Sequence, residues 1–203
     1  DRTNWLGLLK QLAPKRRWRA VRHLVIVPAY REELETLRST FAALLQSDFP
    51  AKQLLVVLAL EAREGREAHG KAKLIRAEFG QAFGQLLVTY HPADLPGEVK
   101  GKGPNITWAG RQAAKLISRR KIPVDSVVVT SLDADNRVSR SYFACLTYLY
   151  LTDPDPLHKS FQPLPMFMNN IWQVPLMTRM VAFGSTFWQM IESTRPHRLR
   201  NFS

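Results

Sequence analysis

Four short apolar runs, each followed by a stretch of helical character, constrain the fold of this chain more than any other feature. They span His23–Pro28, Leu54–Leu60, Leu86–Tyr90 and Ser126–Leu132. Valine, leucine and isoleucine dominate the runs without polar alternation, which is typical of strands buried on both faces of a parallel sheet. The sequence therefore predicts an α/β fold with a mainly parallel, Rossmann-like sheet and helices on both of its faces.

The segments between these runs have helical periodicity. Leucine and phenylalanine recur at three- and four-residue spacing within Glu32–Leu45, and the charged stretch Glu64–Phe79 suits a helix that returns from the second strand. Further helices are expected over about Pro104–Arg119 and from near Ser139. With 203 residues and 45% apolar content, the chain can bury one substantial core, so we expect one domain over residues 23–203.

The net charge of +12 lies mostly at the two ends of the chain. Residues 1–22 carry +6 and residues 193–203 carry +3, which leaves +3 for the centre. In the first segment, basic side chains are interspersed with leucine and tryptophan, a pattern that suits anionic lipid better than a groove that tracks phosphates. We therefore expect a basic amphipathic flank over residues 1–22, a membrane surface as partner and no nucleic acid; a solvated arm is the structural alternative.

Two aspartates one residue apart, Asp133 and Asp135, follow the fourth apolar run and are called the acidic pair below. The carboxyl end of a parallel strand is where an open α/β sheet presents ligand-binding groups. The spacing would place both carboxylates on one face, where their oxygens suit Mg²⁺ or Mn²⁺. The structural alternative is an Asx turn that closes the strand and caps the next helix.

A loop that contains glycine and lysine, 100-KGKGPN-105, precedes the third expected helix. Lys102 would neutralise phosphate charge, the flanking glycines would let backbone amides approach an anion, and the helix N-terminus would add partial positive charge. Together with the strand ends at Val27–Glu32 and Glu61, this loop should meet the acidic pair at one edge of the sheet. An ordinary flexible turn is the alternative, because neither common glycine-rich phosphate-binding pattern is present.

The order and spacing of these segments resemble the inverting family-2 glycosyltransferases of the GT-A fold, the group that includes cellulose and hyaluronan synthases. Val27-Pro28-Ala29-Tyr30 followed by Glu32 is similar to the first nucleotide-contacting motif, V-P-A-Y-N-E, with Arg31 in place of the asparagine. Glu61 stands where the family usually has an aspartate that contacts the base. Lys102-Gly103-Pro104-Asn105 resembles the K-A-G-N segment beside the donor diphosphate, and the acidic pair stands at the D-x-D position.

The resemblance covers roughly residues 23–150 and implies a site for a UDP- or GDP-linked sugar donor. A divalent ion, Mg²⁺ or Mn²⁺, would bridge the two phosphates, with Asp135 as first metal ligand and Asp133 sharing the metal or holding the ribose. Lys102 would offset diphosphate charge as the anomeric bond breaks. The implied activity is sugar transfer to a glycan or lipid-linked acceptor at the cytoplasmic face of a membrane. The implied donor-binding residues are Pro28, Ala29, Tyr30, Glu32, Glu61, Lys102, Asn105, Asp133 and Asp135.

Inversion also requires a carboxylate general base on the acceptor side. The family takes it from a downstream acidic motif, and Glu192 is the only late carboxylate in this chain. We expect Glu192 to be a surface residue and the base to lie beyond Ser203. Residues 23–203 would then be a truncated domain that binds donor with little or no turnover.

The stretch Phe161–Ile191 holds all five methionines, with Arg179 as its only charge. Flexible thioethers and aromatic rings predict a lipid-adjacent or acceptor-facing surface, and a core helix pair is the alternative. The five histidines show no spacing typical of a zinc site. Cys145 lies in an apolar helical stretch, where core packing is its expected role.

Two other function classes fit parts of the sequence. A sugar-phosphate nucleotidyltransferase shares the α/β sheet and the metal requirement, but it is expected to have a glycine-rich loop after the first strand, where this chain has Pro28-Ala29-Tyr30. A basic nucleic-acid- or lipid-binding module would have no chemistry at the sheet edge.

Overall fold

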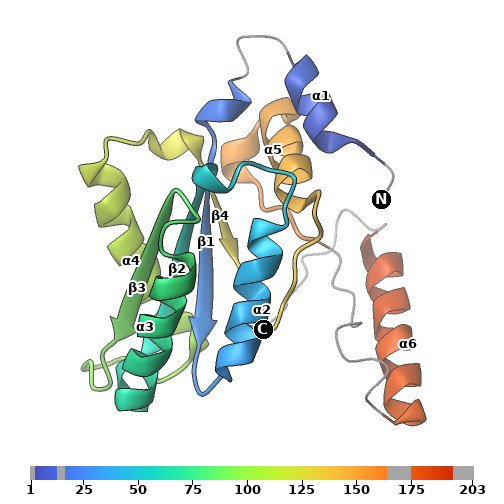
Figure 1. Cartoon of the computed structure of the whole chain (residues 1–203). Coiled ribbons are helices and arrows are strands. Elements are labelled where there is room, and N and C mark those ends of the chain that lie inside the picture. The colour runs from blue at the N-terminus through green and yellow to red at the C-terminus, as the bar shows by residue number, and fades with distance from the viewer. Residues whose placement is uncertain (1–2, 13–16, 164–174, 194–203) are drawn as a thin grey trace. The chain divides into compact units, whose positions relative to one another are not determined.

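A four-stranded parallel sheet forms the centre of the fold (Figure 1). The computed structural model describes residues 3–12, 17–163 and 175–193 and divides the chain into two compact units, Asp1–His158 and Lys159–Ser203. The sheet belongs to the first unit and has the strand order β3-β2-β1-β4. Its strands are β1 (Arg22–Ala29), β2 (Leu54–Glu61), β3 (Gln85–His91) and β4 (Val127–Ser131). The predicted parallel α/β sheet is confirmed.

The helices alternate with these strands along the chain. Those of the first unit are α1 (Trp5–Gln11), α2 (Leu34–Leu45), α3 (Arg66–Phe79), α4 (Lys102–Arg119) and α5 (Tyr142–Thr152). The second unit contributes α6 (Leu176–Ser193). Short 3₁₀ turns join them: η1 (Trp18–Ala20), η2 (Ala51–Gln53), η3 (Ala62–Glu64), η4 (Val124–Ser126) and η5 (Pro156–His158).

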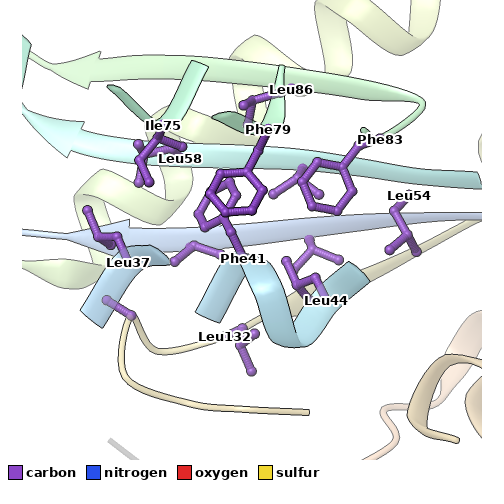
Figure 2. Packing of buried hydrophobic residues seen from close by; sticks show 14 of the residues in the cluster. Leu37, Phe41, Leu44, Leu54, Leu58, Ile75, Phe79, Phe83, Leu86 and Leu132 are labelled. Carbon is purple, nitrogen blue, oxygen red and sulfur yellow. The ribbon is translucent and has the colours of Figure 1, made fainter. Parts of the chain in front are cut away.

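The apolar side chains of the central strands point alternately to two helical layers. On one face, side chains such as Leu58 pack with Phe41 of α2 and Ile75 of α3, as Figure 2 shows. On the opposite face, Ile26 and its neighbours pack against the small and apolar face of α4. Helices therefore cover both faces, as predicted. Phe41 has no exposed surface, and its truncation to alanine would cost about 3–5 kcal/mol of stability.

The fourth strand departs from the prediction that it is buried on both faces. Val129 of β4 is 60% exposed, whereas Val128, on the other face, is buried. The reason is that β4 lies at the edge of the sheet, while the buried face of α4 packs over β1 and β2. A hollow of about 600 Å³ lies here, lined mainly by apolar side chains of β1, β4 and α4; among the described residues that line it, Lys121 is the only charged one.

The basic flank is partly built into the first unit. Leu9 of α1 is fully buried, and the ring centroid of Trp5 lies 5.6 Å from that of Tyr148 in α5. Lys10 and Arg19 remain exposed. The apolar side chains that suggested lipid contact thus pack largely against the protein, while the basic groups stay available to an anionic surface; membrane contact stays a prediction.

The methionine-rich segment Phe161–Ile191 belongs to the second unit, and its residues 164–174 lie outside the described residues. Within α6, large apolar side chains including Phe183, Phe187 and Trp188 are exposed. Glu192 falls in the last turn of α6, and its side chain is outside the described set. Across residues 3–12, 17–163 and 175–193, no helix has both the length and the apolar character needed to cross a bilayer.

Candidate functional site

A pocket opens at the carboxyl end of the sheet because the two neighbours of β1 end at different heights. The pairing of β1 with β2 continues to Ala29 and Leu60, whereas its pairing with β4 stops at Ile26 and Ser131. One further bond, from the Leu132 N–H to the Ile26 carbonyl at 2.9 Å, closes that ladder. The chain then diverges from β1 and leaves a space beside the end of the strand.

Pro28 is compatible with this central strand for the same reason. Residues two apart on a strand direct their backbone N–H and C=O groups to the same neighbouring strand. The backbone groups of Pro28, like those of Ile26, therefore point toward β4. The β4 ladder has already ended there, and the missing N–H of proline removes no ladder bond. The proline ring instead contributes to the wall of the pocket.

The pocket has a volume of about 250 Å³ and brings together five of the nine predicted donor-binding residues. Its lining consists of Pro28, Glu32, Lys102, Asp133, Ala134 and Asp135. It lies between β1 and β4, where the strand order changes direction, because β2 and β3 follow on one side of β1 and β4 lies on the other. Ligands of open α/β sheets bind at this kind of switch point.

Lys102 reaches the pocket from the first turn of α4. The predicted loop 100-KGKGPN-105 is only partly a loop, because the helix begins at Lys102 and not near Pro104. Proline is tolerated in a first helical turn, where the N–H it lacks would have no acceptor within the helix. The Lys102 ammonium forms an ion pair with the Asp133 carboxylate, and both side chains are about half exposed.

The acidic pair lies on a turn whose side chains alternate between solvent and core. Asp133 and Asp135 are exposed, while Leu132 and Ala134 are buried. The turn is closed by a bond from the Asn136 N–H to the Asp133 carbonyl at 2.9 Å. The next helix, α5, begins at Tyr142 rather than near Ser139, and its N-cap residue is Ser141, so the acidic pair does not cap it.

Four predicted site residues lie outside the lining of the pocket. Ala29 is buried within β1. Asn105 is buried as well, and its amide donates a hydrogen bond to the Ala59 carbonyl at 2.9 Å, which attaches the start of α4 to β2. The ring of Tyr30 is half-buried and lies under the guanidinium of Arg63, whose central carbon is 4.0 Å from the ring centroid. Glu61 is the fourth.

The Glu61 carboxylate belongs to a buried charged network at the ends of β2 and β3. Its Oε2 lies 3.3 Å from Nδ1 of His91 and 3.4 Å from Nε of Arg63. The other ring nitrogen of His91, Nε2, lies 2.9 Å from a carboxylate oxygen of Glu98. A neutral imidazole has one donor and could satisfy only one of these carboxylates, so the arrangement favours the imidazolium form.

The pKa of His91 follows from this arrangement. Burial by itself lowers the pKa, but the hydrogen bonds to Glu98 and Glu61 and the charges of both carboxylates outweigh it. The pKa of His91 is therefore raised above its ordinary value. The protonated ring attaches Glu98, in the loop that leads to Lys102, to the end of the sheet.

The pocket offers hard oxygen ligands to a cation. In the described part of the chain, no group of three or more histidine, cysteine, aspartate or glutamate side chains is arranged to hold a metal ion by itself. The acidic pair supplies two carboxylates at one pocket, which fits an ion such as Mg²⁺ or Mn²⁺ that takes its remaining ligands from phosphate oxygens and water. Asp133 and Asp135 are the residues that would hold it.

Several residues that define this region were missed by reasoning from the sequence. Thr40, Arg63, His91 and Glu98 were not among the predicted site residues. His91 is the last residue of the third strand. Its position at the same edge of the sheet as the other strand ends could have identified it as a candidate site residue. The other three belong to helices or loops without a recognisable motif, and only their contacts identify them.

Neither a scan against protein-family models nor a search of curated proteins gave a match to this chain. The functional interpretation therefore depends on the chemistry of the pocket and on the motif resemblance.

Proposed function

We propose that this chain carries the donor site of a metal-dependent glycosyltransferase and binds a nucleotide-sugar through its diphosphate. The observation that carries the proposal is the common pocket of Lys102 and the acidic pair at the switch point of the sheet. A cationic side chain facing two carboxylates is an arrangement that can hold a dianionic diphosphate together with a divalent ion. The acceptor would be a glycan or lipid-linked molecule at the cytoplasmic face of a membrane.

The residues of the pocket have distinct roles in this proposal. Asp133 and Asp135 hold the cation, which when bound offsets the negative charge of the departing nucleoside diphosphate. Lys102 faces the same phosphates from the start of α4, where the partial positive charge of the helix N-terminus adds to its own. Both interactions strengthen as charge develops on the leaving group, and this is the requirement for lowering a barrier.

The base and ribose of the nucleotide would extend toward the ends of β2 and β3. Tyr30 offers an aromatic face beside Arg63, and Glu61 offers a carboxylate within a charged network. In this proposal Glu61 acts on the base only as part of that network, since its carboxylate already contacts two cationic partners. We therefore expect Glu61 to affect the preference for UDP or GDP more than the affinity for the diphosphate.

The exposed apolar side chains of α6 and the basic groups of the flank support the membrane part of the proposal. Aromatic and aliphatic side chains in contact with water are unfavourable unless a partner covers them. Anionic lipid would attract the exposed Lys10 and Arg19.

Titration calorimetry with UDP and with GDP, each with and without Mn²⁺, tests the donor site. We expect micromolar binding that requires the metal and is lost in Asp135→Asn, which removes one negative charge without changing side-chain size. Asp94→Asn is the matched control, because Asp94 is an exposed carboxylate in the loop before α4 and does not line the pocket.

Two results would contradict the proposal. The first is nucleotide binding of equal strength with and without Mn²⁺. The second is salt-sensitive binding to duplex DNA with no response to either nucleotide, which would favour a basic nucleic-acid-binding module.

A further inference from the structure

A buried hydroxyl on α2 contacts the backbone between the two aspartates. Thr40 is 1% exposed, and its Oγ1 donates a hydrogen bond to the Ala134 carbonyl at 2.6 Å. Thr40 does not line the pocket itself. Its partner, Ala134, is the one residue that separates Asp133 from Asp135. The bond therefore contacts the backbone of the acidic pair on the side that faces α2.

The bond and the direction of the acidic pair are related through the peptide of Ala134. Because the Ala134 carbonyl is held toward α2 and the Ala134 side chain is buried, the neighbouring side chains at Asp133 and Asp135 are directed to the pocket side. Rotation of the 134 peptide would break the bond and leave a buried carbonyl without a partner, which is unfavourable in a core.

The residues that follow α2 bind the chain again at Arg140. Arg140 carbonyl accepts hydrogen bonds from the Asp48 N–H at 2.9 Å and from the Ser47 hydroxyl at 3.1 Å, just after the end of α2. The segment from Ala134 to Arg140 is thus attached to α2 and its C-terminal end at two places, about two helical turns apart. The turn of the acidic pair is therefore attached directly at Ala134, and the chain that follows it is attached again at Arg140.

α2 also begins next to a residue of the pocket. Glu32, which lines the pocket together with the acidic pair, is followed almost at once by the start of α2 at Leu34. Thr40 lies on that helix and binds the turn that carries the acidic pair. The hydrogen bond therefore links the helix that follows Glu32 to the turn of the two aspartates.

We propose that Thr40 is a positioning residue, which sets the geometry of the acidic pair for cation and diphosphate through the Ala134 carbonyl. This inference rests on the proposed function for the ligand, but the conformation of the turn can be measured without any ligand. No atom of Thr40 needs to touch the nucleotide.

The test compares Thr40→Val with Thr40→Ser and with Thr147→Val. Thr147 is the control, since its hydroxyl is also fully buried and donates to a helix carbonyl, that of Phe143, at 2.7 Å; the same hydroxyl lies 2.7 Å from Nε2 of the buried His23. It lies on α5 and is not part of the pocket. Thr40→Ser retains the hydroxyl and should behave as the unmodified chain.

Two measurements are made on each variant. The first is the affinity for UDP in the presence of Mn²⁺, which we expect to fall about tenfold in Thr40→Val and to stay within about twofold in Thr40→Ser and Thr147→Val. The second is the hydrogen-exchange rate of the Asn136 amide, which closes the turn. We expect faster exchange in Thr40→Val alone.

The outcomes separate this inference from the proposed function. Unchanged Asn136 exchange in Thr40→Val, or an equal loss of affinity in Thr147→Val, overturns the positioning role. If the unmodified chain binds no nucleotide, the proposed function fails, and the exchange rates still decide whether Thr40 holds the turn. If Thr40→Val does not fold, Thr40→Ala is compared with Thr40→Ser instead, with the same two measurements.

Discussion

The ammonium of Lys102 is paired with the carboxylate of Asp133, although the two residues are 31 positions apart in the sequence. One comes from the first turn of α4 and the other from the turn that follows β4. Without a metal ion, Lys102 provides the positive charge next to Asp133. In the proposed function, a bound cation would compete with Lys102 for the Asp133 carboxylate, and Lys102 would become available to the phosphates.

The Lys102 ion pair predicts opposite effects of one substitution on two ligands. Lys102→Met removes the cation that competes for Asp133, so Mn²⁺ alone should bind more tightly, by about two- to fivefold for a half-exposed pair. UDP in the presence of Mn²⁺ should bind more weakly, because the phosphates lose a cationic partner. Calorimetry with each ligand measures both effects. Lys100→Met, which removes a lysine paired with Asp94 in the preceding loop, should leave both affinities unchanged.

The His91 network predicts a stability contribution that depends on pH. Because the pKa of His91 is raised in the folded protein, its contacts with Glu98 and Glu61 contribute fully below the unfolded pKa near 6.5. They are lost as pH rises through the folded value. Glu98→Gln should therefore cost about 1 kcal/mol in the free energy of unfolding at pH 6 and progressively less toward pH 9.

Urea unfolding at several pH values measures this effect of Glu98→Gln. Asp94→Asn in the same loop is the control, since the Asp94 side chain is 87% exposed and should give no pH-dependent change. An equal cost of Glu98→Gln at pH 6 and pH 9 would show that protonation of His91 does not hold the loop.

A second histidine, His23, should make the stability of the folded protein sensitive to acid. His23 is fully buried between the rings of Phe49 and Phe143, and burial lowers its pKa from 6.5 to about 3. The unfolded chain binds a proton between these values and the folded chain does not. Stability should therefore fall as pH decreases from about 6.5, by about 1.4 kcal/mol per unit from this residue.

His23→Leu tests this prediction, with the pH slope as the readout rather than absolute stability. The variant should show a shallower decrease of the unfolding free energy between pH 6 and pH 4. The Thr147 hydroxyl keeps its acceptor at Phe143, so the substitution leaves no hydroxyl unpaired there. Identical slopes in both proteins would assign the acid sensitivity to other groups.

The backbone conformation of Arg31 indicates a position where a substitution can increase the free energy of unfolding. Its φ of +62° lies in the left-handed region, which is unfavourable for a residue with a Cβ and a long side chain and is favourable for asparagine and glycine. Arg31→Asn should stabilise the protein by about 0.5–1 kcal/mol. Arg31→Ala has no short polar side chain that could hydrogen-bond to the local backbone in this conformation, and it should bring no comparable gain. Lys121→Asn, at the other left-handed position with φ of +53°, should give a similar gain away from the pocket.

The fold was largely predictable because local patterns determine it. The runs at Leu54–Leu60 and Leu86–Tyr90 correspond to β2 and β3 within one residue at each end. Burial on both faces was correctly inferred for β1 and β2, which lie in the middle of the sheet, and wrongly for β4. An apolar run contains no information on whether a strand lies in the centre or at the edge, since that depends on the order of all strands.

The candidate site was predictable where residues lie at strand ends and not where helices and loops meet. Lys102, Pro28 and the acidic pair were expected at one edge of the sheet, and the structure brings them into one pocket. Glu61 and Asn105 follow the same motifs, yet burial and hydrogen bonds direct them elsewhere. Motif spacing predicts that a residue lies near the carboxyl end of its strand. The direction of its side chain depends on its contact partners, which are His91 for Glu61 and the Ala59 carbonyl for Asn105.

The alternation of exposed and buried side chains after β4 implies that this turn is sensitive to length more than to composition. Ser131, Asp133 and Asp135 are exposed, whereas Leu132 and Ala134 are buried. Inserting or deleting a single residue between Val127 and Asp133 would reverse this parity and move acidic side chains into the core. In related chains we therefore expect other small residues at position 134. We expect selection against insertions or deletions of one residue between Val127 and Asp133.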